Sequence, residues 1–131
     1  MNKVVARFAD GHMVKGMTAD FFPNKDVFHV SIAGVAGMES IEIRTLDLKA
    51  LFFVKTFEGD PDYAERKVFD PSRAPAGRRI RVVFKDGEVL VGTTTGYQPG
   101  RVGFFLEPAD ANSNNERCYV VASSASDIGF L

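Results

Sequence analysis

Histidine and cysteine side chains, which often carry metal or nucleophilic chemistry, are scarce and scattered in this chain. His12 and His29 are the only histidines, they fall in different predicted strands, and no second pair of ligands accompanies either one. Because a zinc site needs three or four converging ligands, we interpret both as surface or interface residues. Cys118 lies in a predicted strand, where a small buried hydrophobe is a better interpretation than a nucleophile. The sequence therefore predicts no catalytic residue, no metal site and no cofactor.

Two other stretches have the composition of phosphate-binding segments. Residues 96–103 are rich in glycine, but neither a helix nor a Lys-Ser/Thr pair follows, so we interpret them as a turn. Residues 66–81 concentrate arginine and lysine, with acidic residues among and before them. A solvated, partly self-paired linker is the favoured interpretation of that segment.

Length, charge and cysteine count narrow the class of protein. The 131 residues are enough for one ordinary domain or two small ones, and a net charge of −1 provides no general attraction for nucleic acid or anionic membranes. A single cysteine excludes an intramolecular disulfide and fits a reducing cytoplasm. Since no apolar run reaches the length of a signal peptide or of a membrane span, we expect a cytoplasmic protein without membrane association.

Alternating apolar and polar residues predict strands from the start of the chain. The inward residues of the first strand would be Val4, Ala6 and Phe8, and the outward ones Lys3, Val5 and Arg7. Asp10-Gly11 then predicts a hairpin turn, and the next strand, over residues 12–22, is interrupted by Gly16, which indicates a bulge or bend.

The following residues predict three more strands and then a linker. We expect strands at 27–32, 40–44 and 49–54, with a flexible connection over 33–38 and a tight turn at 45–48. The strand at 49–54 is apolar throughout and should be buried on most sides. Residues 56–78 carry most of the prolines and could form at most one short helix, from Asp60 to Lys67.

From residue 79 the chain repeats the plan of its first part. Asp86-Gly87 and Gly92 correspond to Asp10-Gly11 and Gly16, and seven of the 23 positions from Phe8 to Val30 are identical in the second copy. We interpret this as an internal duplication. The expected fold is all-β, with two tandem five-stranded small barrels at 1–55 and 79–131 joined by the linker at 56–78.

This pattern of strands and turns resembles the Sm-like or SH3-like small barrel, and the Sm-like resemblance is the closer. Asp20-Phe-Phe-Pro-Asn24 is similar to the end of the first Sm motif, and Ile43-Arg44 to part of the second. The resemblance implies a pocket for a stacked RNA base formed by Asp20, Asn24 and Arg44. The second copy has Gly96, Gly100 and Val121 at these positions. The whole chain also resembles an uncharacterised bacterial domain family.

One difference between the copies predicts an interface. Phe52 corresponds to Gly129, and if Phe53 points into its barrel, Phe52 must point out of it. We expect an outward phenylalanine to be covered by the second barrel, by a second chain, or by the linker aromatics Phe57, Tyr63 and Phe69. Our hypothesis is that the two barrels pack into one unit through this strand.

The functional expectation is a non-catalytic binding or scaffold module that contacts protein, either itself or another, through exposed strand edges. An alternative is Sm-like binding of single-stranded RNA at Asp20, Asn24 and Arg44, which the net charge disfavours. An enzyme that uses carboxylates not recognisable in the sequence is a third, less favoured hypothesis. The oligomeric state is left open.

Overall fold

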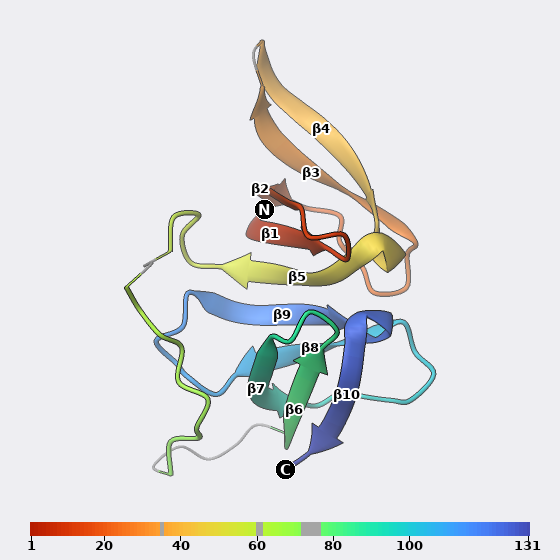
Figure 1. Ribbon diagram of the computed structural model, residues 1–131. Coiled ribbons are helices and arrows are strands. Elements are labelled where there is room, and N and C mark those ends of the chain that lie inside the picture. Colours follow the sequence, from red (N-terminus) through yellow and green to blue (C-terminus); the bar gives the residue numbers. More distant parts are fainter. Residues whose placement is uncertain (35, 60–61, 72–76) are drawn as a thin grey trace.

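The computed structural model describes residues 1–34, 36–59, 62–71 and 77–131, and the regular structure in these residues is almost entirely strand (Figure 1). The strands are β1 (Asn2–Phe8), β2 (Met13–Thr18), β3 (Val27–Gly34), β4 (Gly37–Arg44), β5 (Leu48–Val54), β6 (Arg78–Phe84), β7 (Val89–Thr94), β8 (Gly103–Pro108), β9 (Asn115–Val121) and β10 (Ala125–Phe130). Single 3-10 turns, η1 (Thr45–Asp47) and η2 (Ala122–Ser124), precede β5 and β10. The expected all-β class is confirmed. Among these residues no helix is long and apolar enough to span a membrane.

The two Asp-Gly turns form as their composition predicts. Gly11 and Gly87 have φ angles of 100° and 94°, a region that favours glycine, and each glycine N–H donates to a carbonyl at the end of the preceding strand. The aspartate side chains accept hydrogen bonds from the backbone two residues on, at 3.1 Å for Asp10 and 2.9 Å for Asp86. Local turn chemistry therefore determines the β1–β2 and β6–β7 hairpins.

Gly16 and Gly92 occupy the points where the next strand approaches most closely. A Cβ atom on Gly16 would lie 2.4 Å from the backbone oxygen of Ser31, and one on Gly92 would lie 2.0 Å from that of Glu107. No larger residue fits at either place without a backbone shift. The glycines thus allow β2 to pack against β3, and β7 against β8, at these crossings.

All ten strands belong to one antiparallel sheet with the order β10-β6-β7-β8-β9-β5-β1-β2-β3-β4. Each half of the chain contributes five consecutive positions, and within each half the fifth strand lies beside the first. The halves meet where β5 pairs with β9, with Phe52 opposite Cys118 and Val54 opposite Asn115. This β5–β9 pairing is called the joint below.

The joint explains why the ten strands form one open sheet, in which the expected tandem arrangement of two barrels is not confirmed. A strand has two hydrogen-bonding edges, and β5 uses one for β1 and the other for β9. It therefore has no edge left to pair with β4 and close the first half, while β10 pairs with β6 and not with β9. In Figure 1 the β3–β4 hairpin extends away from the rest of the sheet at one end, and β10 lies at the other.

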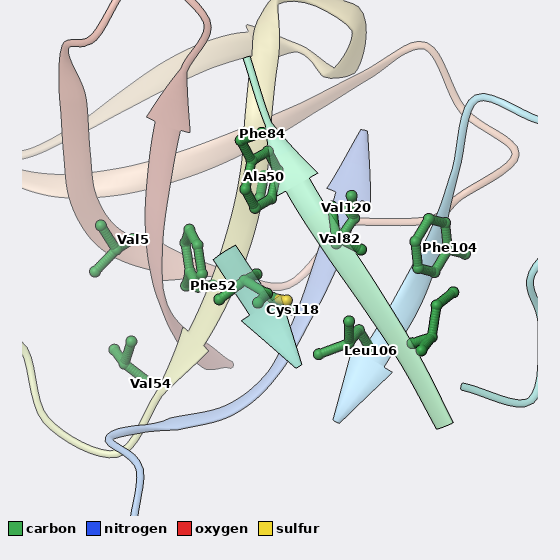
Figure 2. Packing of buried hydrophobic residues seen from close by; sticks show 12 residues of the cluster. Val5, Ala50, Phe52, Val54, Val82, Phe84, Phe104, Leu106, Cys118 and Val120 are labelled. Carbon is green, nitrogen blue, oxygen red and sulfur yellow. The ribbon is translucent and has the colours of Figure 1, made fainter. Parts of the chain in front are cut away.

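Two hydrophobic clusters form, and each takes residues from both halves. The first combines second-half residues such as Cys118 and Leu106 with Val5 and Phe52 of the first half. The second combines first-half residues with Tyr119 and Val121 of β9. Figure 2 shows Phe52 between Val5 and Cys118 in the first cluster. The expectation that Val5 faces solvent is therefore wrong, because the second half covers the outer face of β1 and β5.

Burial of β5 on both faces is confirmed, since all seven of its residues are buried. Some boundaries differ from those expected from sequence. The second strand ends at Thr18 and not near residue 22, and β3 and β4 run on through most of the expected flexible connection at 33–38, pairing as far as Gly34 and Gly37. Val35 lies outside the described residues. Pairing with the neighbouring strand extends β3 and β4 beyond what local composition indicates.

The connection between the halves runs without regular structure over its described residues. The helix expected from Asp60 to Lys67 begins on two residues outside the described part, and residues 62–67 form no helix. This segment is instead tied to the loop between β8 and β9. Asp110, which is buried, accepts hydrogen bonds from the Tyr63 hydroxyl and from the backbone N–H of Arg66 at 2.9 Å.

Candidate functional site

The outer edges of the sheet are the clearest candidates for a binding site. In the described part of the chain, β4 pairs only with β3 and β10 pairs only with β6, so each strand keeps one edge of backbone N–H and C=O groups unpaired. Large apolar side chains are exposed along them: Met38 on β4 is 68% exposed, and Phe130 and Leu131 at the end of β10 are 39% and 66% exposed. An unpaired edge with apolar side chains is a template for an added strand.

The β4 edge is acidic on its outer face. Ile41 and Ile43 turn toward the core of the first half, while Ser40 and Glu42 lie on the opposite face and are exposed. The Nε2 atom of His29, on the neighbouring strand, lies 3.6 Å from a carboxylate oxygen of Glu42. This face of the first half therefore carries carboxylates beside an imidazole.

Asp20 anchors this imidazole from the turn that follows β2. Its carboxylate accepts hydrogen bonds from the backbone N–H of His29 at 2.9 Å, from the Thr18 hydroxyl at 3.2 Å, and lies 2.7 Å from Nδ1 of His29. Burial opposes ionisation of Asp20, but the hydrogen bonds from His29 and Thr18 outweigh it and lower the pKa of the carboxyl. The hydrogen bond to Asp20 in turn raises the pKa of His29, with Glu42 adding to the effect.

Of the three residues of the implied RNA pocket, Asp20 directs its hydrogen bonds to Thr18 and His29. Asp20 is engaged with His29 and Thr18, whereas Asn24 is exposed in the turn before β3 and Arg44 is exposed at the end of β4. Neither Asn24 nor Arg44 is a hydrogen-bond partner of Asp20 within the described residues. The contact between Asp20 and His29, nine residues apart, has no counterpart in the second copy, where Gly96 replaces the aspartate.

The β10 edge is bordered by basic residues of β6. The guanidinium carbon of Arg78 lies 3.4 Å from the centre of the Phe130 ring, which also contacts Tyr97 edge-on at 5.6 Å. Arg79 lies 4.6 Å from the ring of Phe69, and Arg81 is exposed on the same strand. The two ends of the sheet thus differ in charge, with carboxylates beside β4 and guanidinium groups beside β10.

The four aromatic residues expected at an interface fall into two groups. Phe52 and Phe57 lie at the first hydrophobic cluster, and the Phe57 carbonyl accepts a hydrogen bond from Lys15 Nζ at 2.9 Å. Tyr63 and Phe69 contact the second half through Asp110 and Arg79 respectively. Of the linker aromatics, Phe57 thus packs against the cluster that contains Phe52, whereas Tyr63 and Phe69 contact other residues of the second half.

An ion pair between the halves, formed by a buried lysine and two partly exposed carboxylates, was not anticipated from the sequence. Lys49 of β5 is almost fully buried, and its Nζ lies 2.6 Å from Asp86 and in contact with Glu88, both on the β6–β7 hairpin. The same ammonium lies 4.7 Å from the centre of the Phe84 ring. A lysine inside an otherwise apolar run was the available signal, because such a residue must find partners when the run is buried.

A cleft of about 590 Å³ lies between the linker and the β8–β9 loop. Its walls include Lys55, Glu65, Glu88 and Asn114, and its two carboxylates are already engaged, Glu65 with Lys67 and Glu88 with Lys49. Among the described residues no group of three or more His, Cys, Asp or Glu side chains is arranged to hold a metal ion. The sheet edges, with their unpaired backbone groups, are therefore a better candidate for a binding site than this cleft, whose carboxylates are already paired.

In a comparison with known protein families, one family model covers the whole chain. A model described as a family of unknown function, DUF6982, matches residues 1–131. The chain belongs to DUF6982. No curated protein matches the chain, and no solved structure does. The open ten-stranded sheet, with its acidic and basic ends, is thus the fold of this DUF6982 member.

Proposed function

We propose that this protein is a non-catalytic binding or scaffold module that contacts other protein chains by strand addition at its outer edges. The proposal rests on β4 and β10, the strands at the two ends of the sheet, each of which is paired with a neighbouring strand along one edge only. Backbone hydrogen bonds to such an edge supply affinity, and alternate side chains supply specificity. With a single, buried cysteine, the protein suits a reducing compartment such as the cytoplasm.

Several features support protein rather than small-molecule binding. β4 is eight residues long and has no proline within it, whereas edges that are protected against pairing are short or carry proline. Met38 and Leu131 are both about two-thirds exposed along these edges, which gives each edge an apolar anchor. The same sheet already joins two five-stranded halves edge to edge at the joint, so this backbone geometry supports strand addition.

A photo-crosslinking amino acid placed in the chain tests the proposal in the cells that make the protein. Introduced at Met38 on β4 or Leu131 after β10, it should form covalent protein adducts on illumination, because a partner strand would lie against it. The matched control is Met13, which is half-exposed on β2, away from both edges. If neither edge position gives more adducts than the control, the proposal is wrong.

A second candidate is the binding of single-stranded RNA at the turn that follows β2. The observation that favours it is Phe22, which is half-exposed between Asp20 and Asn24, with Nζ of Lys25 4.9 Å from the centre of its ring. An exposed aromatic ring beside a cation is the arrangement on which a base can stack. Arg44, at the end of β4, would add a phosphate contact.

Fluorescence anisotropy with a labelled single-stranded oligonucleotide tests this second candidate. Binding at low salt should weaken as salt increases, and both Phe22→Ala and Arg44→Ala should reduce it. Glu116→Ala, in the other half, is the control and should leave the affinity unchanged. An absence of binding at low salt would exclude RNA binding at this turn.

A further inference from the structure

The joint between the two halves shows how this sheet can be extended. In the first half β5 lies beside β1, and its other edge pairs antiparallel with β9, from Ala50 opposite Val120 to Val54 opposite Asn115. The fourth strand of one half thus adds to the fifth strand of the other. Because the halves have the same strand order, each half carries both of these positions.

The two free edges of the molecule are these same two positions. β10 is the fifth strand of the second half, and β4 is the fourth strand of the first. We propose that copies of the chain join head to tail, with β10 of one copy adding antiparallel to β4 of the next, so that the contact between molecules repeats the joint within each molecule. This inference rests on the proposed function, since it names the partner of the same edges.

The register of the joint predicts which exposed residues meet. The last pair of the joint is Val54 opposite Asn115, and the residues at the equivalent positions on the free edges are Leu131 and Met38. Leu131 and Met38 are 66% and 68% exposed in the single chain. Pairing of the edges would place these two apolar side chains opposite each other and remove part of their surface from water.

A phenylalanine at the end of β10 shows what a neighbour would cover. In the first half, Phe53 is only 4% exposed, because Phe105 lies 6.2 Å away, ring centre to ring centre, and Tyr119 lies in the same cluster. Its equivalent in the second half, Phe130, contacts Tyr97 and is 39% exposed. Phe130 lacks the contacts that Phe53 receives from the other half, namely those with Phe105 and Tyr119.

Charge complementarity favours a second copy as the missing partner. The positions equivalent to Phe105 and Tyr119 on the β4 side are His29 and Glu42, and the His29 ring lies between the carboxylates of Glu42 and Asp20. Arg78 lies on the Phe130 ring, so head-to-tail pairing would bring its guanidinium toward these carboxylates. The basic border of β10 and the acidic face beside β4 are therefore matched within a single sequence.

The contact should nevertheless be weaker than the joint. At the joint Phe52 and Val5 insert apolar side chains into the core of the other half, whereas the equivalent positions beside the free edge are Gly129 and Arg81. Less apolar surface would be buried and more of the attraction would come from screened charges. We therefore expect reversible assembly that weakens as salt increases. A head-to-tail contact of this kind forms a ring or an open chain and not a two-fold dimer.

Disulfide trapping with the full chain tests the arrangement. Met38→Cys and Leu131→Cys are made in separate chains, one with a size tag, then mixed and oxidised mildly. The mixed disulfide should dominate over both same-variant disulfides, and a chain with both substitutions should give a ladder of oligomers. The buried Cys118, whose pKa is raised by burial, should not react. Met13→Cys mixed with Leu131→Cys is the control pair.

Two results would overturn the head-to-tail arrangement. The first is a mixed disulfide no more abundant than that of the control pair. The second is a predominant disulfide between two Met38→Cys chains, which would indicate a two-fold contact between β4 strands.

Sedimentation of the protein without added cysteines tests the charge pairing. Glu42→Arg should weaken self-association about tenfold, and combining it with Arg78→Glu should restore it, because the swap exchanges the two charges across the contact. Failure of the double variant to recover would refute the pairing. Purified protein that stays monomeric, while crosslinkers at the edges capture other proteins in cells, would overturn this inference and leave the proposed function standing. If the protein neither self-associates nor forms crosslinks to other proteins at its edges, this inference and the proposed function are both wrong.

Discussion

Replacing Phe52 by alanine tests whether the two halves unfold as one unit. Phe52 is 4% exposed and lies on β5 opposite Cys118 of β9. Most of the cluster around it belongs to the second half, and the Arg7 guanidinium lies 5.9 Å from the centre of its ring. Truncating this side chain removes an apolar group of the first half from the core of the second.

The expected cost follows from burial. Truncating a fully buried phenylalanine to alanine lowers the free energy of unfolding by about 3–5 kcal/mol, because apolar surface is lost and a cavity remains. Domains of this kind are stable by about 5–15 kcal/mol, so the variant should lose a large fraction of the total. For a chain of this size the melting temperature should fall by roughly 10–20 °C.

Urea denaturation followed by tyrosine fluorescence and by circular dichroism measures the effect, since the chain has three tyrosines and no tryptophan. The two signals should change together in one transition for both the natural protein and Phe52→Ala. Hydrogen exchange should accelerate in β6 to β10 as well as in β1 to β5. Phe22→Ala, at a half-exposed ring, is the matched control and should cost less than about 1 kcal/mol.

Two outcomes would refute this reasoning. If Phe52→Ala lowered the free energy of unfolding by less than about 1 kcal/mol, the side chain would not be packed as the first cluster requires. If the two halves melted separately, the joint would not couple them.

Three further changes probe the ion pairs and the close strand crossing. Lys49→Met should lower the free energy of unfolding by about 1–2 kcal/mol at neutral pH, because it removes the buried ammonium and leaves two partly exposed carboxylates. Lys49 lowers the pKa of Asp86, so the pair stabilises the fold above the ordinary carboxyl pKa, and this stabilisation is lost as the pH falls through the lowered value. In Lys49→Met, the free energy of unfolding measured with urea should therefore fall less steeply as the pH is lowered. Asp20→Asn should lower the pKa of His29 toward its ordinary value in an NMR titration. In the natural protein the raised pKa stabilises the fold below the ordinary imidazole pKa, and this stabilisation is lost as the pH rises through the raised value; the variant should lack it. Gly92→Ala should cost about 2–3 kcal/mol in urea denaturation, because its Cβ would meet a backbone oxygen of β8 at 2.0 Å.

Matched variants separate these effects from general damage. Gly129→Ala adds a Cβ where no atom lies within 4 Å and should be close to neutral, so equal losses at both glycines would contradict the strand-crossing argument. Lys85→Met changes an exposed lysine near the same ion pair and should leave the acid profile intact. An imidazole titration unchanged by Asp20→Asn would show that the contact does not set the pKa of His29.

Local features of the fold could be predicted because their causes lie within a few residues. The Asp-Gly turns need only a residue that accepts positive φ and a side chain that bonds its own backbone, and both turns form as expected. The apolar run that became β5 predicted burial on both faces, which is observed. The length of β3 and β4 could not be predicted, because it depends on their pairing with each other.

The candidate site was only partly foreseeable. A resemblance pointed to Asp20, Asn24 and Arg44 as a group, whereas the structure joins Asp20 to His29 across the turn between β2 and β3. The only available signal was a comparison between the copies. His29 and Glu42 stand where the second half has the apolar Phe105 and Tyr119, and this shows that one face is covered and the other is not.

The sequence by itself determined which side chains share a face of each strand, where the chain turns, and that five strands occur twice. Only the tertiary structure decided that β5 pairs with β9 and leaves β4 and β10 at the ends of a single sheet. The reason is physical: side chains mark the faces of a strand, but its two hydrogen-bonding edges are backbone and are nearly the same in every sequence. The sequence contained one sign of this pairing. Val5 and Phe52 are apolar at positions that point away from the core of the first half, and both pack against the second half.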